Sequence, residues 1–227
     1  MSIDYFDGTK TGEKVEADQK LNGLKTLPTV FELLGFCYYY TAFFIGPQFT
    51  FNRYRKYLTG ELFKNSKEPG KKLETPTLPT IKVLVGGIIY LIVNTIGTSI
   101  FPSSYLTTND YLVESTIFHR LYVLFFTCYF LLSKYLGIWL LGEGSSRLSG
   151  IGFGGYDSNG LPIWNGLANV NPYLYETSTS IQGVVMSFNI NTNDWSKRYI
   201  FKRLRFLGNK DLSLIVTTMV SNLYKFN

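Results

Sequence analysis

Three asparagines lie at alternate positions where an apolar run meets a strongly basic one. They are Asn189, Asn191 and Asn193, within the stretch MSFNINTNDWSKRYIFKRLRF. Burying an amide without partners costs about 1 to 3 kcal/mol, so an asparagine placed directly after VVMSF needs hydrogen-bond partners. An amide cannot act as a base, and a catalytic Asn189 would donate a hydrogen bond to a developing oxyanion or orient a true base. The stretch therefore predicts a polar site that can stabilise negative charge.

A histidine would be the obvious base beside such an amide. The sequence contains one histidine, His119. His119 comes just before the apolar segment from Leu121 to Leu141, whereas the asparagines come after it. We therefore expect His119 to lie at the membrane interface opposite to that of the asparagines. The sequence thus presents half of a plausible catalytic pair.

The residues after the asparagines predict a helix from Trp195 to Leu207. Asn193 or Asp194 would cap its N-terminus. One broad side of this helix is apolar but interrupted by Arg203, which suits it to the membrane interface with its basic residues toward lipid phosphates. An extended NINTN would turn all three amides to one face, whereas a helix would align only Asn189 with Asn193.

Three apolar segments are long enough to cross a bilayer. They are Thr29 to Phe49, Ile81 to Phe101 and Leu121 to Leu141. A mean hydropathy of +0.06 is too polar for a chain that is membrane throughout, so we expect sizeable polar loops. Residues 1–26 are polar and lack a basic segment followed by an apolar one, so we expect no signal peptide. Cys37 and Cys128 lie in apolar runs, which predicts small buried side chains and not a disulfide framework.

The charges of the loops orient these segments. Residues 52–80 carry seven lysines and arginines, whereas residues 102–118 carry none and include Asp110 and Glu114. By the positive-inside rule the first loop is cytoplasmic and the second lumenal. The third segment then returns the chain to the cytoplasmic side, where the basic residues of 197–210 also fall. Membrane orientation therefore accounts for the net charge of +6, and we expect no nucleic-acid partner.

Residues 142–184 are rich in glycine, asparagine, serine and tyrosine, and their turn signals argue against a long helix. GIGFGG is not expected to bind phosphate, because no strand precedes it and no Lys-Ser or Lys-Thr follows it. Irregular backbone is tolerated beside a membrane where it packs on protein or lines an aqueous cavity. We therefore expect residues 142–211 to form a re-entrant or interfacial region of a single all-α, polytopic membrane domain that covers residues 1–227.

At SFNINTNDW and the RYIFKRLRFLGNK that follows, the sequence resembles the membrane-bound O-acyltransferase family, and within it the lysophosphatidylcholine acyltransferase group. GFCYYYTAFFIGPQFTFNRY, GIGFGGYD and ANVNPYLYET recur in the same order in that group. The likeness runs from about Asp4 to Ser213. It implies a part of the family's fold, with about three spans plus interfacial helices, located in the endoplasmic reticulum membrane.

The resemblance also implies a reaction and a site. Asn189 matches the family's site asparagine, and members transfer a fatty acyl group from acyl-CoA, a co-substrate, to the hydroxyl of a lysophospholipid such as lysophosphatidylcholine. Membrane lipids are the remaining partners, no metal ion or further cofactor is implied, and the substrate-binding residues stay open.

The family's histidine belongs to a Trp-His-Gly motif on a following span, which does not appear after GNKDLS in this sequence. We therefore expect this chain alone to be a truncated, inactive version of the enzyme. One alternative is a non-catalytic membrane pseudoenzyme that modulates a full-length acyltransferase. A transporter or channel is a weaker alternative, since only Glu32 and Lys134 place charges inside the predicted spans.

Overall fold

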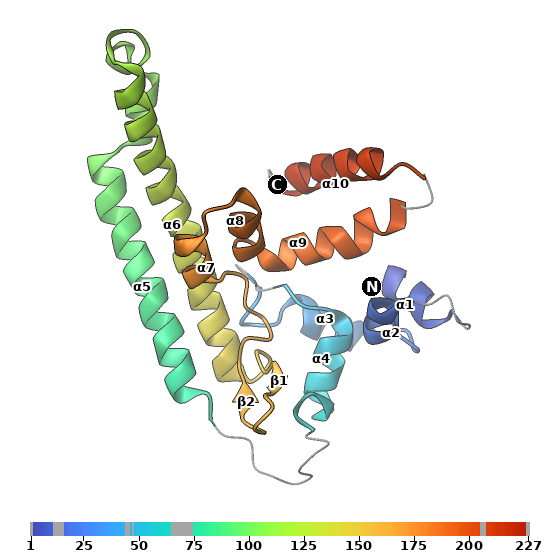
Figure 1. Cartoon of the computed structure of the whole chain (residues 1–227). Coiled ribbons are helices and arrows are strands. Elements are labelled where there is room, and N and C mark those ends of the chain that lie inside the picture. The colour runs from blue at the N-terminus through green and yellow to red at the C-terminus, as the bar shows by residue number, and fades with distance from the viewer. Residues whose placement is uncertain are drawn as a thin grey trace.

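Helices dominate the structure, a computed structural model that describes residues 2–10, 16–43, 46, 48–64, 75–204 and 208–225 (Figure 1). The two long helices are α5 (Thr77–Ile100) and α6 (Ile117–Ser149). The elements before α5 are α1 (Ser2–Gly8), α2 (Ala17–Asn22), α3 (Val30–Cys37), α4 (Phe51–Leu58) and η1 (Glu61–Phe63). The short helical turns η2 (Ser103–Thr107) and η3 (Asp110–Glu114) join α5 to α6.

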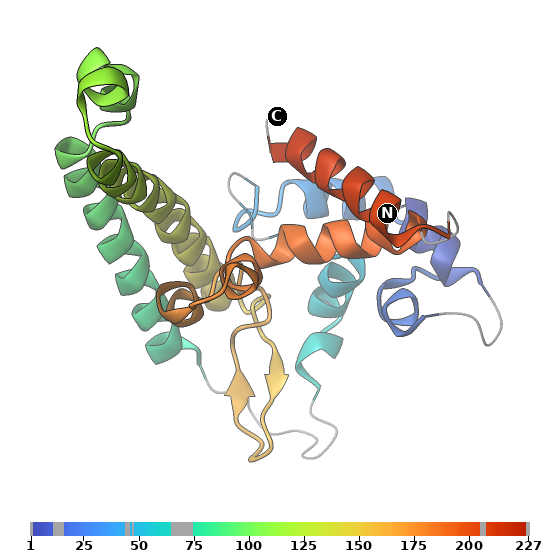
Figure 2. The ribbon, with the colours of Figure 1, turned by 45° about the horizontal axis from the view of Figure 1, so that its top comes forward.

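The elements after α6 begin with a two-stranded antiparallel hairpin, β1 (Gly155–Tyr156) and β2 (Pro162–Ile163). The helices that follow are α7 (Pro172–Thr177), α8 (Ile181–Ser187), α9 (Ile190–Ser196), the π turn η4 (Lys197–Phe201) and α10 (Lys210–Lys225). Figure 2 shows that α9 leads from α8, beside α6, toward the N-terminal helices. The prediction of a helical chain is confirmed, and the largest sheet among the described residues is this hairpin.

Helices α5 and α6 form a tight antiparallel hairpin in which small residues let the two backbones approach (Figure 1). A methyl group added to Gly137 would meet the carbonyl oxygen of Gly87 at 2.9 Å, and one added to Gly97 would overlap the ring of Phe130. Both helices are long and apolar enough to cross a membrane, and most of their surface faces outward. They contain the predicted segments 81–101 and 121–141 except for residue 101, which follows α5 directly.

The predicted span from Thr29 to Phe49 is wrong. Helix α3 ends at Cys37, and residues 38–43 form turns; residues 44, 45 and 47 of this segment lie outside the described part of the chain. The aromatic side chains that made the segment look like a span pack instead against α4. The ring of Phe36 lies 5.3 Å from that of Phe51, and the ring of Tyr39 lies 5.9 Å from that of Tyr54. Local aromatic packing therefore replaces a membrane crossing.

The predicted burial of the two cysteines is also wrong. Cys37 and Cys128 are both exposed, and they form no disulfide. Cys128 lies on α6, whose outer surface is apolar, so its small side chain suits a helix that faces lipid.

The N-terminal helices dock on η4 and on the residues that directly follow it, through charged and polar contacts. Asp7 accepts hydrogen bonds from the guanidinium of Arg203, and Asp4 accepts one from Tyr199 at 2.7 Å. Lys202 pairs with Glu16 at 2.8 Å. Two of the basic residues expected to face lipid phosphates are therefore paired with carboxylates, and the polar start of the chain lies on the same side as η4.

Replacing Asp7 by Asn should loosen α1 and α2 from η4. The Asp7 carboxylate is 3% exposed, so loss of its charged hydrogen bonds should cost about 1 to 3 kcal/mol. Hydrogen exchange of the α1 and α2 amides would measure this. The matched control is Glu16→Gln, because its carboxylate is 40% exposed and such a pair contributes about 0 to 1 kcal/mol. Equal protection in both variants would contradict the assignment.

The same contact should make the docking depend on pH. The hydrogen bond from Arg203 holds the pKa of Asp7 below its ordinary value of 3.8, against an opposing effect of burial, and Lys10 adds to the lowering. A depressed folded pKa means that the stabilisation is present above the unfolded value and is lost as the pH falls through the folded one. Protection of α1 should therefore persist at pH 5 and above and fall only below about pH 4.

The two long helices predict a topology that labelling can test. The α5–α6 connection carries Asp110, and the segments before α5 and after α6 are basic, so the connection should be lumenal and the remainder cytoplasmic. Lys67 of the basic loop lies outside the described residues, whereas Lys64 is described. In microsomes, cysteines at positions 64 and 110 should react with impermeant reagent from opposite sides. Reaction from one side would contradict the topology.

Candidate active site

Asn189 adopts a left-handed backbone conformation, with φ 54° and ψ 46°, at the junction of α8 and α9. It is the one non-glycine residue with positive φ in the described part of the chain. This conformation costs an L-residue roughly 1 to 2 kcal/mol, and asparagine tolerates it better than most. Its side chain does not cap α9 and hydrogen-bonds to no other described residue. The backbone therefore holds a partly exposed amide that is available to a ligand.

The conformation of Asn189 is set by Asn169, a buried residue of the ANVNPYLYET motif. The carbonyl oxygen of Asn169 accepts the Ile190 N–H at 2.9 Å, and its side-chain oxygen accepts the Asn191 N–H at 2.9 Å. These bonds satisfy two of the N–H groups that the start of a helix leaves unpaired. Asn169, twenty-two residues before Asn191, thus fixes the turn on which Asn189 sits.

The same motif ties α7 to the Asn189 turn. The Asn171 N–H donates to the Ser187 carbonyl at 2.8 Å, and Val170 and Phe188 form an isolated antiparallel bridge. The Asn171 side chain also caps α7 by accepting the Leu174 N–H. Sequence reasoning missed Asn169 and Asn171 as supports of the site, although the motif that contains them was a visible signal.

Aromatic packing attaches this turn to α6. The ring of Phe188 lies 5.0 Å from that of Trp139 and 5.7 Å from that of Tyr175. Trp139 belongs to the part of α6 predicted to lie in the membrane, near its cytoplasmic end. The Asn189 turn therefore packs directly beside the long helix α6.

Neither Asn193 nor Asp194 caps a helix that begins at Trp195, so the predicted helix start is wrong. Helix α9 already begins at Ile190 and continues into η4; residues 205–207 of the predicted helix lie outside the described part. Asn193 lies inside α9 and donates its amide to the carbonyls of Val185 and Phe188, at 2.9 and 3.1 Å. The earlier start follows from Asn169, which the local sequence could not reveal.

His119 cannot serve as a base for Asn189 in this structure. It lies in the first turn of α6, whereas the Asn189 turn packs near Trp139. The twenty residues between them correspond to roughly 30 Å of helix at a rise of about 1.5 Å per residue. Its ring nitrogen lies 3.4 Å from the hydroxyl of Tyr105, at the α5–α6 connection. His119 therefore lies at the end of α6 away from the Asn189 turn.

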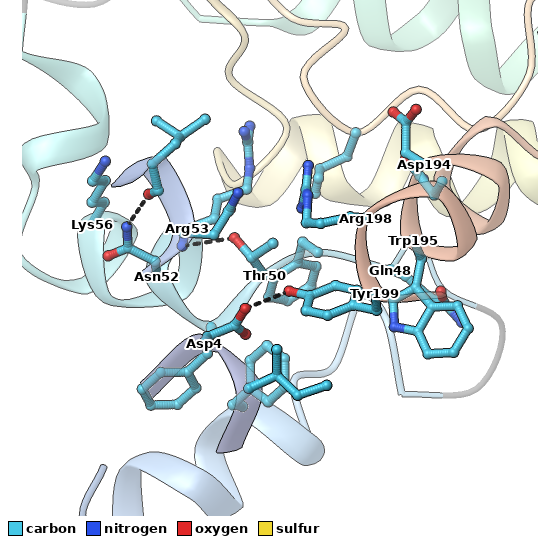
Figure 3. Close-up of a pocket in the computed structure, with 18 of the residues that line it drawn as sticks. Asp4, Gln48, Thr50, Asn52, Arg53, Lys56, Asp194, Trp195, Arg198 and Tyr199 are labelled. Atoms are coloured by element: carbon cyan, nitrogen blue, oxygen red, sulfur yellow. Dashed lines mark hydrogen bonds between the residues drawn. The ribbon is translucent and has the colours of Figure 1, made fainter. Parts of the chain in front are cut away.

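A cavity of about 620 Å³ begins one turn beyond Asn189 and lies between α9, η4, α4 and the N-terminal helices (Figure 3). Asn191 lines it, and its side-chain nitrogen is buried without a hydrogen-bond partner among the described residues. The charged and aromatic side chains that Figure 3 labels around the cavity are Asp4, Arg53, Lys56, Asp194, Trp195, Arg198 and Tyr199. The cavity thus combines cationic, anionic and aromatic side chains.

Arg53 builds one wall of this cavity and holds the glycine-rich stretch in place. Its guanidinium donates two hydrogen bonds to the Ile151 carbonyl, at 2.8 and 3.1 Å, and one to the Phe153 carbonyl. Burial lowers the pKa of Arg53 to about 10, which leaves it charged at neutral pH. GIGFGG therefore presents carbonyl oxygens to an arginine, in agreement with the expectation that it does not cradle phosphate.

The chain belongs to the membrane-bound O-acyltransferase family, whose family model matches residues 8–223. It is 42% identical to lysophospholipid acyltransferase 5 of Mus musculus over 94% of this chain and 43% of that protein. The Homo sapiens protein of that name is 40% identical over the same shares.

A more distant relative is the lysophospholipid acyltransferase of Schizosaccharomyces pombe, 29% identical over 90% of this chain and 40% of that protein. The chain thus spans less than half the length of the curated relatives it matches.

Proposed function

We propose that this chain takes part in phospholipid remodelling as the amide-bearing part of a lysophospholipid acyltransferase in the endoplasmic reticulum membrane. The reaction would transfer a fatty acyl group from acyl-CoA to the free hydroxyl of a lysophospholipid, with lysophosphatidylcholine as the first candidate. The observation that carries the proposal is Asn189, whose side-chain amide hydrogen-bonds to no other described residue and which is held in a strained conformation beside the α6 span. Such strain persists where surrounding structure enforces it, and it gathers at active sites.

The chemistry assigns Asn189 a specific role. Attack of the lysophospholipid hydroxyl on the thioester carbonyl places negative charge on the carbonyl oxygen, and the thiol of CoA leaves. An amide N–H that meets this oxygen stabilises the tetrahedral intermediate, an effect worth about 10² to 10³ in rate for one donor. A separate base must take the hydroxyl proton, and the family resemblance assigns that task to a histidine of a Trp-His-Gly span.

The cavity beyond Asn189 suits the nucleotide end of acyl-CoA. Its volume of about 620 Å³ is in the range of small-molecule sites, which are roughly 300 to 1,000 Å³. Lys56 lines it, and its ammonium group has no partner among the described side chains, so it can meet a phosphate. Trp195 and Tyr199, with ring centroids 5.9 Å apart, offer flat surfaces for a purine.

Replacing Lys56 by Ala should weaken CoA binding to the purified chain by roughly tenfold, the worth of one charge-assisted hydrogen bond. Lys197→Ala is the control, because Lys197 is exposed and does not line the cavity. Equilibrium binding of CoA measures both variants. Unchanged CoA affinity in Lys56→Ala, or an equal loss of affinity in the control, would contradict the assignment of this cavity to CoA.

A non-catalytic modulator is the second candidate, favoured by the roughly 30 Å of helix between His119 and the Asn189 turn. Since general base catalysis contributes about 10² to 10⁴ in rate, we expect no useful acyl transfer by this chain alone. An assay with acyl-CoA and lysophosphatidylcholine tests this. Robust turnover by the unaltered chain would contradict the missing-base argument.

A further inference from the structure

Glu176 places a carboxylate beside the middle of the α5–α6 hairpin. It lies in α7, and both of its contacts are with the long helices. One contact is Tyr90, which lies thirteen residues after the start of α5 and ten before its end, near the centre of that span. An ionisable group at this depth is costly and commonly marks a substrate path.

Two phenols hold this carboxylate in place. Tyr90 donates its hydroxyl to Glu176 Oε1 at 2.8 Å, and Tyr129 of α6 donates to the same oxygen at 3.2 Å. A carboxylate offers about four acceptor positions, so two neutral donors on one oxygen leave Oε2 unused. In the described part of the chain, no lysine or arginine pairs with Glu176, and its side chain is exposed. The carboxylate is fixed by neutral groups but lacks a counter-charge.

We infer that Glu176, with its surrounding tyrosines, binds the trimethylammonium group of a choline head group on the acceptor lysophospholipid. This inference rests on the proposed function, because it concerns the acceptor of that reaction. A quaternary ammonium donates no hydrogen bond, so it is recognised by negative charge and by aromatic surfaces. Glu176 supplies the charge, and Tyr90 and Tyr129 bring two rings to its carboxylate.

Glu176 and Asn189 each directly follow one of two aromatic residues that pack on each other. Tyr175, the neighbour of Glu176, has its ring centroid 5.7 Å from that of Phe188, which directly precedes Asn189. The packing of these two rings therefore brings together the chain segments that carry the carboxylate and the amide. A lysophospholipid also places its cationic head group a short linker away from its free hydroxyl, so both ends can be held together.

The test is competition binding to the purified chain with radiolabelled lysophosphatidylcholine, displaced by lysolipids of the same acyl chain and different head groups. Glu176→Gln keeps an oxygen that accepts from both phenols and removes only the charge. It should weaken lysophosphatidylcholine binding roughly tenfold and leave lysophosphatidylglycerol, which has no cation, unchanged. Glu61→Gln, at an exposed glutamate of η1, is the matched control and should change neither.

The outcomes separate this inference from the proposed function. Equal loss for both lysolipids in Glu176→Gln would make Glu176 a structural residue and overturn the inference. Wild-type affinity for lysophosphatidylethanolamine equal to that for lysophosphatidylcholine would overturn recognition of the quaternary ammonium. Binding of all lysolipids with no effect of Glu176→Gln would also overturn the inference but leave the proposed acceptor class intact. Binding of none would overturn both.

Discussion

Replacing Arg53 by Met should destabilise the folded chain by about 2 to 6 kcal/mol, because it leaves two buried carbonyls unpaired at about 1 to 3 kcal/mol each. The carbonyls belong to Ile151 and Phe153, which are 0% and 2% exposed. Met keeps an unbranched apolar stem like that of arginine, although it is shorter, and it removes all of the donors. The loss of stability in Arg53→Met should therefore reflect the missing hydrogen bonds more than a change in packing.

Chemical unfolding in detergent, with hydrogen exchange of the β1–β2 region, would measure this effect. The Gly154 and Gly166 amides bond the carbonyls of Ile163 and Gly152, so their protection reports on the glycine-rich loop. Arg53→Lys should give an intermediate loss, because one ammonium cannot reproduce the guanidinium fork. Lys56→Met, at the neighbouring position of α4, is the control and should shift stability by less than about 0.5 kcal/mol. An Arg53→Met chain as stable as this control would contradict the role assigned to Arg53.

The long helices were predictable from the sequence because one property, the length of an apolar run, indicates them. A run of about 20 apolar residues is long enough to cross the hydrocarbon whatever its local context. The segment from Thr29 to Phe49 is similarly apolar, but the prediction of a span there was wrong, because its aromatic residues pack on α4. The contact of Phe36 with Phe51 joins two segments whose pairing no hydropathy pattern encodes.

The site was predictable in part. The resemblance selected Asn189, but the local sequence suggested a helix cap at Asn193 or Asp194. The helix starts earlier because Asn169, far upstream, supplies the acceptors for its first N–H groups. Such a long-range cap leaves no local signature. The clustering of Glu176 with two tyrosines of the long helices also depends on tertiary structure, and the sequence did not indicate it.

Replacing Asn189 by Ala should abolish most catalysis in a chain that carries the complete catalytic pair. One oxyanion donor is worth about 10² to 10³ in rate. Ala also disfavours the left-handed backbone of this turn, so a loss of rate in Asn189→Ala mixes lost chemistry with lost conformation. Gly adopts this conformation readily and has no amide side chain, so Asn189→Gly separates the two effects.

The most direct measurement is the initial rate of acyl transfer from acyl-CoA to lysophosphatidylcholine by this chain extended with a Trp-His-Gly span from a relative. Asn189→Gly and Asn189→Ala should both fall by about 10² to 10³ relative to the unsubstituted extended chain. Asn159→Ala, at an exposed position of the β1–β2 turn, should leave the rate unchanged. If Asn189→Gly keeps the unsubstituted rate, Asn189 serves only the backbone turn, and its role as the catalytic amide is contradicted.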